Sequence, residues 1–394
     1  MPASKAFTNT FNWNAGTWTQ SKNRTEKTSI LIAGDWAPIR AFAPIIEDSP
    51  ESVYGDLLPV IRSADLSIVN LEAPLSDIGT PVNKSGAVFK GEARHVQGLT
   101  CVPFHAVTLA NNHVFDFGLD AFSQTRDVLD ENGIRYTGAG MDEEEAITPL
   151  ILEASGITVG IINFSEGEDL THAGDARPGV MGWNIDRVAR AVRELKQKVN
   201  LVMVVSHCGI EYIPFPPPYV ADTFRELARA GADLVIGHHP HVPQGISFEG
   251  RVPICHSLGN FVFYQETDLK FRKLGYMLRT GADEDGLVSI EVIPYRIIPR
   301  GLELLTETER EFFFSKLKQV SGPLETREGL TDSWGGFLDY YGQTGFFSEM
   351  AAILEKMDAE PQKGAAMFRN RLTTLQHFHH LKDLMTRIVN DESG

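Results

Sequence analysis

The chain has 394 residues and a mass of 43.6 kDa, and at ~150 residues per domain this length predicts two packed units rather than one or three. Apolar residues make up 42% of the chain and charged residues 22%, which excludes a disordered, collagen-like or coiled-coil protein. The 36 basic residues against 52 acidic ones leave a net charge of −16, which repels nucleic-acid phosphates and anionic lipid headgroups. We therefore expect no nucleic-acid partner and no insertion into a membrane.

The sequence shows neither a membrane segment nor a targeting signal. No stretch approaches the ~20 consecutive apolar residues of a spanning helix. Residues 1–29 hold no apolar core behind a basic start, so no secretory signal is visible and we predict a cytoplasmic protein. The three cysteines, Cys101, Cys208 and Cys255, are an odd number in a long chain, which argues against a disulfide framework. Each lies in or beside an apolar run and is expected to be buried.

Between residue 29 and about residue 299, short β-branched apolar runs alternate with longer amphipathic stretches, a pattern typical of β-α units. The expected strands cover residues 30–33, 66–69, 106–109, 157–162, 201–205, 234–236, 252–256 and 287–293. The expected helices cover residues 54–63, 118–132, 186–198 with Asp186 as the cap, and 219–230. Residues 265–286 are charged and weakly periodic and are expected to form a long excursion. The predicted fold class is α/β, an α+β layered sandwich with flanking helices.

The pattern changes beyond Gly301, where β-branched runs become rare. Apolar residues recur at steps of three or four over residues 363–390, which predicts one amphipathic helix there. Residues 309–320 and 346–357 are expected to form two further helices. We predict a polar N-terminal segment over residues 1–27, a main α/β domain over 28–300, and a helical C-terminal extension over 301–394 that packs on the core beside the sheet rim and closes the pocket there.

Polar, ligand-type residues follow six of the expected strands directly. The groups are Gly34-Asp35, Asn70-Leu71-Glu72, Ala110-Asn111-Asn112-His113, Ser206-His207, Gly237-His238-His239-Pro240-His241 and Ser257-Leu258-Gly259-Asn260. Taken singly they have ordinary structural explanations: a turn at Gly34-Asp35, a helix cap at residues 111–113, a core histidine at His207. Because ligands bind at the carboxyl ends of strands in open α/β sheets, we expect the six groups to converge on one rim.

The chemistry of these groups favours a metal centre. Carboxylate, amide and imidazole donors together suit borderline divalent ions such as Mn, Zn or Fe. About six donors are enough for one or two ions per chain, and two ions that share a carboxylate can clamp the attacking and leaving oxygens of a displacement. The predicted cofactor is therefore a divalent metal ion.

In this order the six groups are similar to the motifs of the bacterial CapA family, which is named for poly-gamma-glutamate capsule synthesis and has a calcineurin-like metallophosphoesterase fold. The similarity runs from about residue 28 to residue 299 and implies a metallophosphoesterase-like β-sheet core over residues 28–300. The residues that match metal ligands are Asp35, Glu72, Asn112, His207, His239 and His241. Asp35 matches the first carboxylate and Glu72 stands where the fold's bridging carboxylate stands.

The same resemblance gives His113 a catalytic role, because it matches the histidine that donates to the substrate oxyanion or leaving group. Asp116 lies three residues after His113 and, if the turn between them is helical, is placed to orient the imidazole, with an N-terminal helix charge as the alternative. The candidates for substrate binding are Lys90, Arg94, Glu211, His238 and Asn260. Of these, Lys90 and Arg94 have an equally ordinary reading as side chains that cover apolar surface with their charged ends in water.

The sequence departs from ordinary metallophosphoesterases at two ligands. These enzymes have Asp-x-His at the first motif, whereas Asp35 is followed by Trp36 and Ala37, so the resemblance implies one histidine ligand fewer. Glu72 replaces the usual bridging Asp, as it does in the family itself. The fold alone does not establish phosphatase chemistry.

Three functions follow as hypotheses. The first is a metal-dependent hydrolase that cleaves a phosphoester or a gamma-glutamyl amide with a metal-bound hydroxide at the strand-end rim. The second is a non-catalytic, metal-binding accessory component of poly-gamma-glutamate or capsule biosynthesis. The third is a transferase in which an acceptor replaces water. The partner expected for the enzyme is a small acidic or phosphorylated substrate, or a gamma-glutamyl compound; the sequence does not indicate an oligomeric state.

Overall fold

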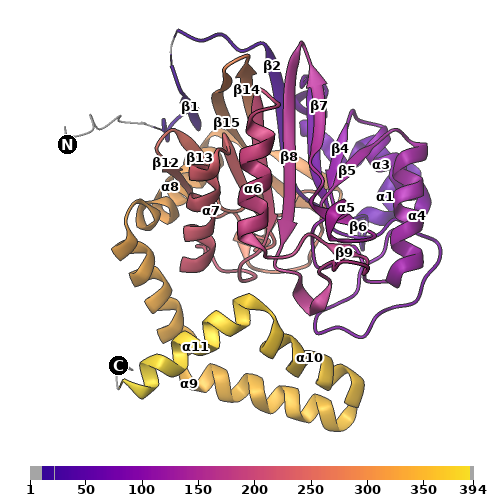
Figure 1. The fold of residues 1–394 in the computed structure, drawn as a ribbon, viewed down its shortest axis with the longest axis vertical. Coiled ribbons are helices and arrows are strands. Elements are labelled where there is room, and N and C mark those ends of the chain that lie inside the picture. The colour runs from indigo at the N-terminus through magenta and orange to yellow at the C-terminus, as the bar shows by residue number, and fades with distance from the viewer. Residues whose placement is uncertain (1–10, 22, 391–394) are drawn as a thin grey trace.

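The computed structural model describes residues 11–21 and 23–390 and contains two large β-sheets (Figure 1). The first sheet has the order β1-β15-β14-β2-β3-β4-β5, with β16 paired to β15. Its strands are β1 (Thr17–Thr19), β2 (Thr28–Trp36), β3 (Leu66–Leu71), β4 (Ala106–Thr108), β5 (Arg135–Thr137), β14 (Leu274–Asp283), β15 (Gly286–Ile298) and β16 (Gly301–Leu304). Strands β2 to β5 run parallel to one another, so their carboxyl ends lie at one edge.

The second sheet has the order β12-β13-β11-β10-β8-β7. Its strands are β7 (Leu150–Ala154), β8 (Ile157–Ser165), β10 (Leu201–His207), β11 (Leu234–His238), β12 (Ile246–Glu249) and β13 (Val252–Cys255). The four central strands are parallel, and β7 and β12 are antiparallel edges. A small separate pair is formed by β6 (Ala139–Gly140) and β9 (Gly179–Val180).

The two sheets pack face to face, and helices cover their outer faces. Ile30 and Ile32 of β2 share one apolar core with Val159 of β8, while Leu31, which points the other way, packs among helices. The helices outside the first sheet include α1 (Phe42–Asp48), α2 (Leu58–Arg62), α3 (Gln97–Thr100) and α4 (Gly118–Glu131). Outside the second sheet lie α5 (Glu143–Ile147), α6 (Ile185–Lys196) and α7 (Pro218–Ala230). The predicted layered α/β sandwich with flanking helices is confirmed.

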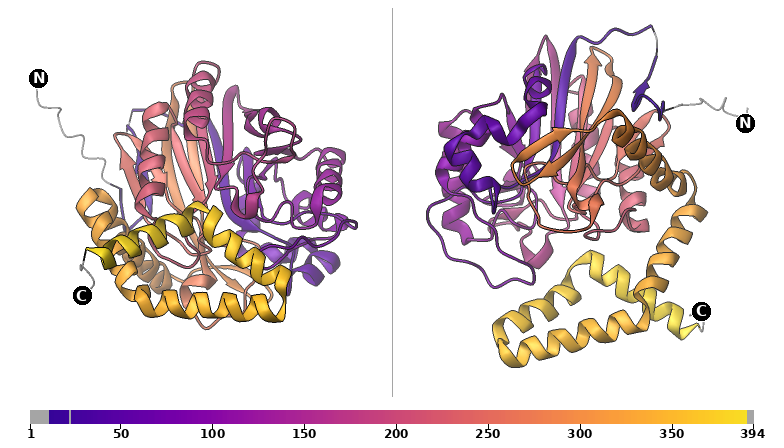
Figure 2. Two further views of the ribbon diagram at one scale, coloured as in Figure 1. Left: turned by 60° about the horizontal axis from the view of Figure 1, so that its bottom comes forward. Right: turned by 180° about the vertical axis from the view of Figure 1, so that it is seen from behind.

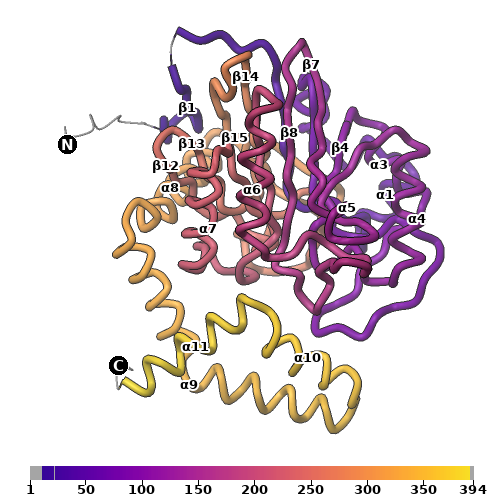
Figure 3. Tube along the Cα trace, in the orientation of Figure 1, coloured from indigo at the N-terminus to yellow at the C-terminus, as the bar shows by residue number. Residues whose placement is uncertain are grey.

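The chain beyond residue 301 is helical after β16, as expected. Its helices are α8 (Glu307–Ser321), α9 (Arg327–Ala359), α10 (Pro361–Thr373) and α11 (Leu375–Val389). Helix α8 inserts Phe313, Phe314 and Leu317 into the core between the sheets. Figures 2 and 3 show α9 leaving the body of the molecule and α10 and α11 returning across the lower ends of the sheets. The boundaries proposed between the three parts stay predictions.

Several expected elements differ in the structure. The expected excursion over residues 265–286 is wrong, because residues 274–283 form β14 in the middle of the first sheet. Both faces of β14 are buried, with Tyr276 toward the second sheet and Met277 toward the helices, so no alternation marks it as a strand. The cap of α6 is Asn184 rather than Asp186, since the Asn184 side chain accepts the backbone N–H of Arg187.

The expected single helix over residues 363–390 is divided at Thr374, whose backbone is extended. This break lets the first turn of α11 meet the core: the backbone N–H of Gln376 donates to Glu166 at 3.0 Å. The expected helix over residues 346–357 is part of the longer α9. The apolar periodicity continues through residues 363–390, but the helix is broken at Thr374, where the chain contacts Glu166.

Two other expectations concern the thiols and the N-terminal segment. Cys208 and Cys255 are buried as expected, but Cys101 is only half-buried. Residues 1–10 of the expected polar N-terminal segment lie outside the described residues; within the remainder, Trp18 on β1 is buried against the second sheet's Phe248. Among the described residues, no helix is both long and apolar enough to cross a bilayer.

Candidate metal centre

The six strand-end groups meet at one place, as the parallel strands require. Asp35 ends β2, Glu72 follows β3, and His207 and His238 end β10 and β11 of the other sheet. Asn112 and His113 follow β4 after a short turn that the Asn111 side chain closes by accepting two backbone N–H groups. All of these side chains are buried. The sandwich therefore brings ligand-type residues from both sheets to one rim.

One group of potential ligands consists of Asn112, His207, His239 and Glu72. The Nε2 atom of His207 lies 3.0 Å from Asn112 Oδ1, 3.1 Å from His239 Nδ1 and 3.4 Å from Glu72 Oε1. Metal bonds of ~2.0–2.1 Å place neighbouring ligand atoms ~3.0–3.4 Å apart, so these spacings fit the edges of one coordination shell.

A second group consists of Asp35, Glu72 and His241, with ligand atoms within 4.8 Å of one another. It is looser, since His241 Nδ1 lies 3.5 Å from Asp35 Oδ2 and His241 Nε2 lies 3.7 Å from Glu72 Oε1. His238 Nδ1 stands 3.1 Å from the other oxygen of Asp35, and Asn260 Oδ1 lies 2.7 Å from His241 Nδ1. Glu72 belongs to both groups, which is the position of a bridging carboxylate.

Several buried oxygen and nitrogen atoms of this cluster lack hydrogen-bond partners, which is the observation that fits it to a metal. Both carboxylate oxygens of Glu72, Oδ2 of Asp35 and Nδ2 of Asn260 have no hydrogen-bond partner among the described residues. A buried polar atom without a partner costs ~1–3 kcal/mol, and more when charged. An ion held between these atoms would remove that cost.

The charges of the cluster perturb one another strongly. Burial and the neighbouring charge of Asp35 raise the pKa of Glu72 well above its usual value. Burial also opposes the ionisation of Asp35, but His238 and His241 outweigh it and hold the pKa of Asp35 well below its usual range. Burial and the nearby imidazole of His239 hold the pKa of His207 well below its usual value, so His207 is neutral and able to bind a cation.

His113 lies beside the two groups with a partner behind it. Its Nδ1 atom lies 2.6 Å from Asp116 Oδ2, and its Nε2 atom faces Glu72 at 3.9 Å. Asp116 also accepts from the buried ammonium of Lys84 at 2.8 Å and from the backbone N–H of Phe89 at 2.7 Å. Asp116 therefore fixes the orientation of the imidazole and leaves Nε2 toward the rim. Burial and Lys84 lower the pKa of His113.

The predicted substrate-binding residues divide into two sets. Glu211 is half-buried beside the imidazoles: burial would raise its pKa, but His241 and His239 outweigh this and lower it. Lys90 and Arg94 do not join the cluster. The Lys90 ammonium lies 4.7 Å from the centre of the Phe117 ring, and Arg94 pairs with Glu47 and Glu92 at the surface.

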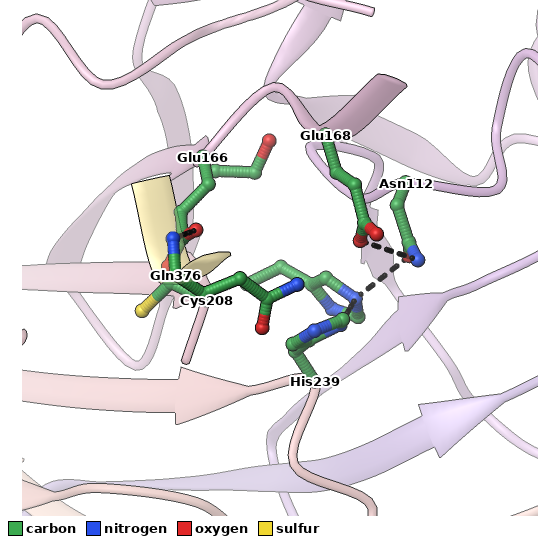
Figure 4. Close-up of a pocket in the computed structure, with 8 residues that line it drawn as sticks. Asn112, Glu166, Glu168, Cys208, His239 and Gln376 are labelled. Atoms are coloured by element: carbon green, nitrogen blue, oxygen red, sulfur yellow. Dashed lines mark hydrogen bonds between the residues drawn. The ribbon is translucent and has the colours of Figure 1, made fainter. Parts of the chain in front are cut away.

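The sequence did not reveal several residues around the cluster. Figure 4 shows a pocket beside His239 that Glu166, Glu168 and Gln376 help to line. Lys84 and Gln376 lie in a loop and in the C-terminal extension, where no pattern distinguishes them. Glu166 and Glu168 follow β8 directly, so the strand-end rule that found the other groups also applied to them. Burial raises the pKa of Glu166 to about 7.

Comparison with known proteins identifies the family. The family model described as "Bacterial capsule synthesis protein PGA_cap" matches residues 29–265, more than half of the chain. The chain belongs to this capsule synthesis family. The match ends before the C-terminal extension, and the resemblance to CapA proteins expected from the six motifs is confirmed.

The chain is also similar to two relatives in sequence and to one solved structure. It is 28% identical over 302 residues to the capsule biosynthesis protein CapA of Bacillus anthracis, covering 72% of each chain. It is 27% identical over 271 residues to the PGA biosynthesis protein CapA of Bacillus subtilis, covering 65% of this chain and 69% of the relative. A 5'-nucleotidase precursor from Thermus thermophilus has a TM-score of 0.42 at 15% identity, covering 74% of this chain and 57% of that one. This last likeness concerns the fold.

Proposed function

We propose that this capsule synthesis family member is a metal-dependent hydrolase, whose divalent ions would be held by two groups of residues that share Glu72. The observation that carries the proposal is that two groups of potential ligands share Glu72, whose two oxygens have no other hydrogen-bond partner among the described residues. The donor set of carboxylate, amide and imidazole suits Mn, Zn or Fe. When bound, such ions lower the pKa of a coordinated water toward ~7 and polarise the bond to be cleaved.

The chain's own residues would then divide the remaining work. Asn112, His207 and His239 would hold one ion, and Asp35 with His241 the other. His113 directs Nε2 to the rim, where it can accept a proton and, once protonated, pass it to the leaving group, because Asp116 occupies Nδ1. The aromatic ring of Phe89, 4.3 Å from the imidazole between centroids, excludes water from one side of His113.

The substrate we propose is small and acidic or phosphorylated, with a phosphoester or a gamma-glutamyl amide as the bond cleaved. Two divalent ions between Asp35 and Glu72 would leave the centre positive, which favours an anion despite the net charge of −16. A cytoplasmic location belongs to the same proposal and rests on the sequence.

A specific observation favours a second function, that of a non-catalytic accessory component that holds an acidic polymer through metal. Ala37 stands where ordinary metallophosphoesterases have a histidine ligand, and the group around Asp35 is the looser of the two. We propose that His238, 3.1 Å from Asp35, supplies the missing nitrogen in the catalytic case.

The test begins with elemental analysis of the full chain purified without chelator, followed by titration with Mn and Zn. Uptake of one or two ions is expected, and uptake of none overturns both functions. The loaded protein is then assayed with bis-p-nitrophenyl phosphate and with gamma-glutamyl-p-nitroanilide, with His113→Ala as the control. Turnover of either substrate that falls in the control supports the hydrolase. Metal uptake with no turnover of either substrate overturns the hydrolase and favours the accessory function.

A further inference from the structure

The C-terminal extension contacts two loops, around residues 84–86 and 168–170. Side chains of these loops contact Asn112 and Asp116, the partner of His113. Helix α10 makes hydrogen bonds near both of its ends, including those of Lys363 near its start and Asn370 near its finish. These residues lie outside the part of the chain that the family model matches. The contacts therefore join the extension to the part of the chain that the family model matches.

The contact at Asn370 leads directly to a potential metal ligand. Asn370 is fully buried, and its Nδ2 donates to Glu168 Oε1 at 3.0 Å. The other oxygen of Glu168 accepts from Asn112 Nδ2 at 3.2 Å. An ionised carboxylate only accepts hydrogen bonds, so Glu168 selects the nitrogen of the Asn112 amide and turns its oxygen toward His207 and the coordination shell.

The loop that carries Glu168 has an unusual backbone. Asp169 and Leu170 have φ angles of 55° and 65°, in the left-handed region that side chains disfavour. Such backbone costs ~1–3 kcal/mol per residue and persists only where the surroundings impose it. Here Asp169 accepts the backbone N–H of Ser85 at 3.3 Å, while Asn370 holds the neighbouring Glu168. The strained backbone of this loop therefore helps to hold Glu168 in position.

The contact at Lys363 reaches the other loop. The Lys363 ammonium donates to the backbone carbonyls of Lys84 and Gly86, at 2.9 and 2.7 Å. Lys84 in turn donates to Asp116 and to the backbone carbonyl of Asn112, at 2.8 and 2.6 Å. Helix α10 thus braces the partner of His113 as well as the ligand Asn112.

We propose that α10 is a working part of the metal centre, in which Asn370 is a positioning residue that acts through Glu168 on the metal ligand Asn112. This inference rests on the proposed metal binding but not on hydrolysis. Partners behind a metal ligand are typically worth ~10–100-fold in metal affinity. Loss of Asn370 should therefore weaken the ion held by Asn112, His207 and His239 and leave the ion at Asp35 and His241 in place.

The experiment titrates Mn and Zn into the metal-free full chain by calorimetry, with thermal unfolding measured in parallel. Asn370→Ala and Glu168→Gln should each weaken one of the two ions by ~10-fold or more. Glu168→Gln keeps the size of the side chain and so covers the case in which Asn370→Ala fails to fold. Asn83→Ala is the matched control, because Asn83 also bonds α10, at Gln362, but lies at the surface.

A double variant separates positioning from general destabilisation. In an Asn112→Ala background, Asn370→Ala should have no further effect on metal affinity, because the residue it acts through is gone. Wild-type affinities in both single variants, or losses that add to that of Asn112→Ala, would overturn the proposal. If the wild-type chain itself takes up no metal, the proposed function falls together with this inference, whereas metal uptake without turnover leaves the inference standing.

A separate observation concerns Gln376, at the start of α11. The cavity it closes has a volume of about 10 Å³, room for about one water molecule. Figure 4 shows the Gln376 carboxamide pointing toward His239. Gln376 is buried as a residue, and its carboxamide makes no hydrogen bond with any residue in the described ranges. An amide placed this way is free to bind whatever the metals hold.

We infer that Gln376 contacts the ligand of the metal centre and donates a hydrogen bond to its anionic oxygen. The probe is inorganic phosphate, titrated into the metal-loaded full chain. A hydrogen bond to a charged group is worth ~1.5–3 kcal/mol, so Gln376→Ala should weaken phosphate ~10-fold or more. Gln343→Ala, an exposed glutamine on α9, is the control. Equal phosphate affinity in Gln376→Ala and wild type, or no phosphate binding by either, would overturn the inference.

Discussion

The bridging position of Glu72 leads to a prediction in which metal reverses an order of stability. Glu72 is fully buried and neither of its oxygens has a hydrogen-bond partner among the described residues, so ionisation of this carboxyl group is costly in the metal-free protein. Glu72→Gln has nearly the same shape and removes the charge. Relief of a buried, unpaired charged group is worth ~1–3 kcal/mol, so in chelator the variant should be more stable than the wild type. In a chain of this size that is a rise of a few degrees in melting temperature.

The direction of this stability difference agrees with the raised pKa of Glu72. Because burial raises the pKa of Glu72 above its value in the unfolded chain, its ionisation disfavours the folded state at every pH above the unfolded pKa, ~4.3. The penalty is therefore present near neutral pH and disappears in acid, where the wild type and Glu72→Gln should converge.

Bound metal should make the wild type more stable than Glu72→Gln. A ligand at 100 times its dissociation constant stabilises the folded state by ~2.7 kcal/mol, and only the wild type keeps the shared carboxylate of both groups. Thermal unfolding in chelator and in excess Mn should therefore give opposite rankings. Glu153→Gln, at an exposed position on β7, is the control that should not differ from wild type in either condition. The same ranking in both conditions, or wild-type metal uptake by Glu72→Gln, would refute the bridging assignment.

Four further predictions concern other parts of the molecule. His239→Ala should lower metal affinity ~10–100-fold together with turnover, whereas His113→Ala should keep its metal and lose ~10²–10⁴ in turnover. Elemental analysis and a phosphodiester assay on both variants separate these two outcomes. Loss of metal in His113→Ala would contradict the catalytic role of His113. Because burial raises the pKa of Glu166 to about 7, the wild type should lose ~3 kcal/mol of stability as pH rises from ~4.3 through about 7. Denaturant unfolding of Glu166→Gln should lack this loss, and an unchanged pH dependence would count against it. Truncation at Pro299 removes α8 from the core between the sheets and should give insoluble protein, so a soluble, active fragment is the contrary result. Native thiol labelling should modify Cys101 first, since the other two cysteines are buried, and equal rates would contradict this packing.

The sequence was most informative where one physical rule connects it to the structure. Parallel strands end at a common edge, so the residues after each strand, such as Asp35, Glu72 and His207, could be placed together before any coordinates. The family resemblance supplied the roles. Glu166 follows β8 in the same way, so the same rule also places it at this edge.

Other parts of the centre could not be found from the sequence, because their effect depends on contacts across long sequence separations. Lys84 belongs to an irregular loop, and only the folded chain shows its ammonium buried against Asp116. Asn370 and Gln376 lie on helices whose apolar periodicity says which face is buried but not which element covers it. The break at Thr374 brings Gln376 to Glu166. It too results from a tertiary contact rather than from local helix propensity.

The unpaired polar atoms of this centre lower the stability of the metal-free folded chain, and the extension covers the centre. The strand ends deliver carboxylates and imidazoles from both sheets into one buried volume, and without an ion they repel one another or lack partners. Water could solvate them if the rim were open, but α10 and α11 lie across it, and the pocket beside Asn112, His207 and His239 has room for about one water molecule. An arrangement that both concentrates these donors and excludes solvent is stabilised when an ion occupies it. Closure by the extension should therefore tighten metal binding and, for the same reason, make entry of any larger substrate depend on movement of α10 and α11.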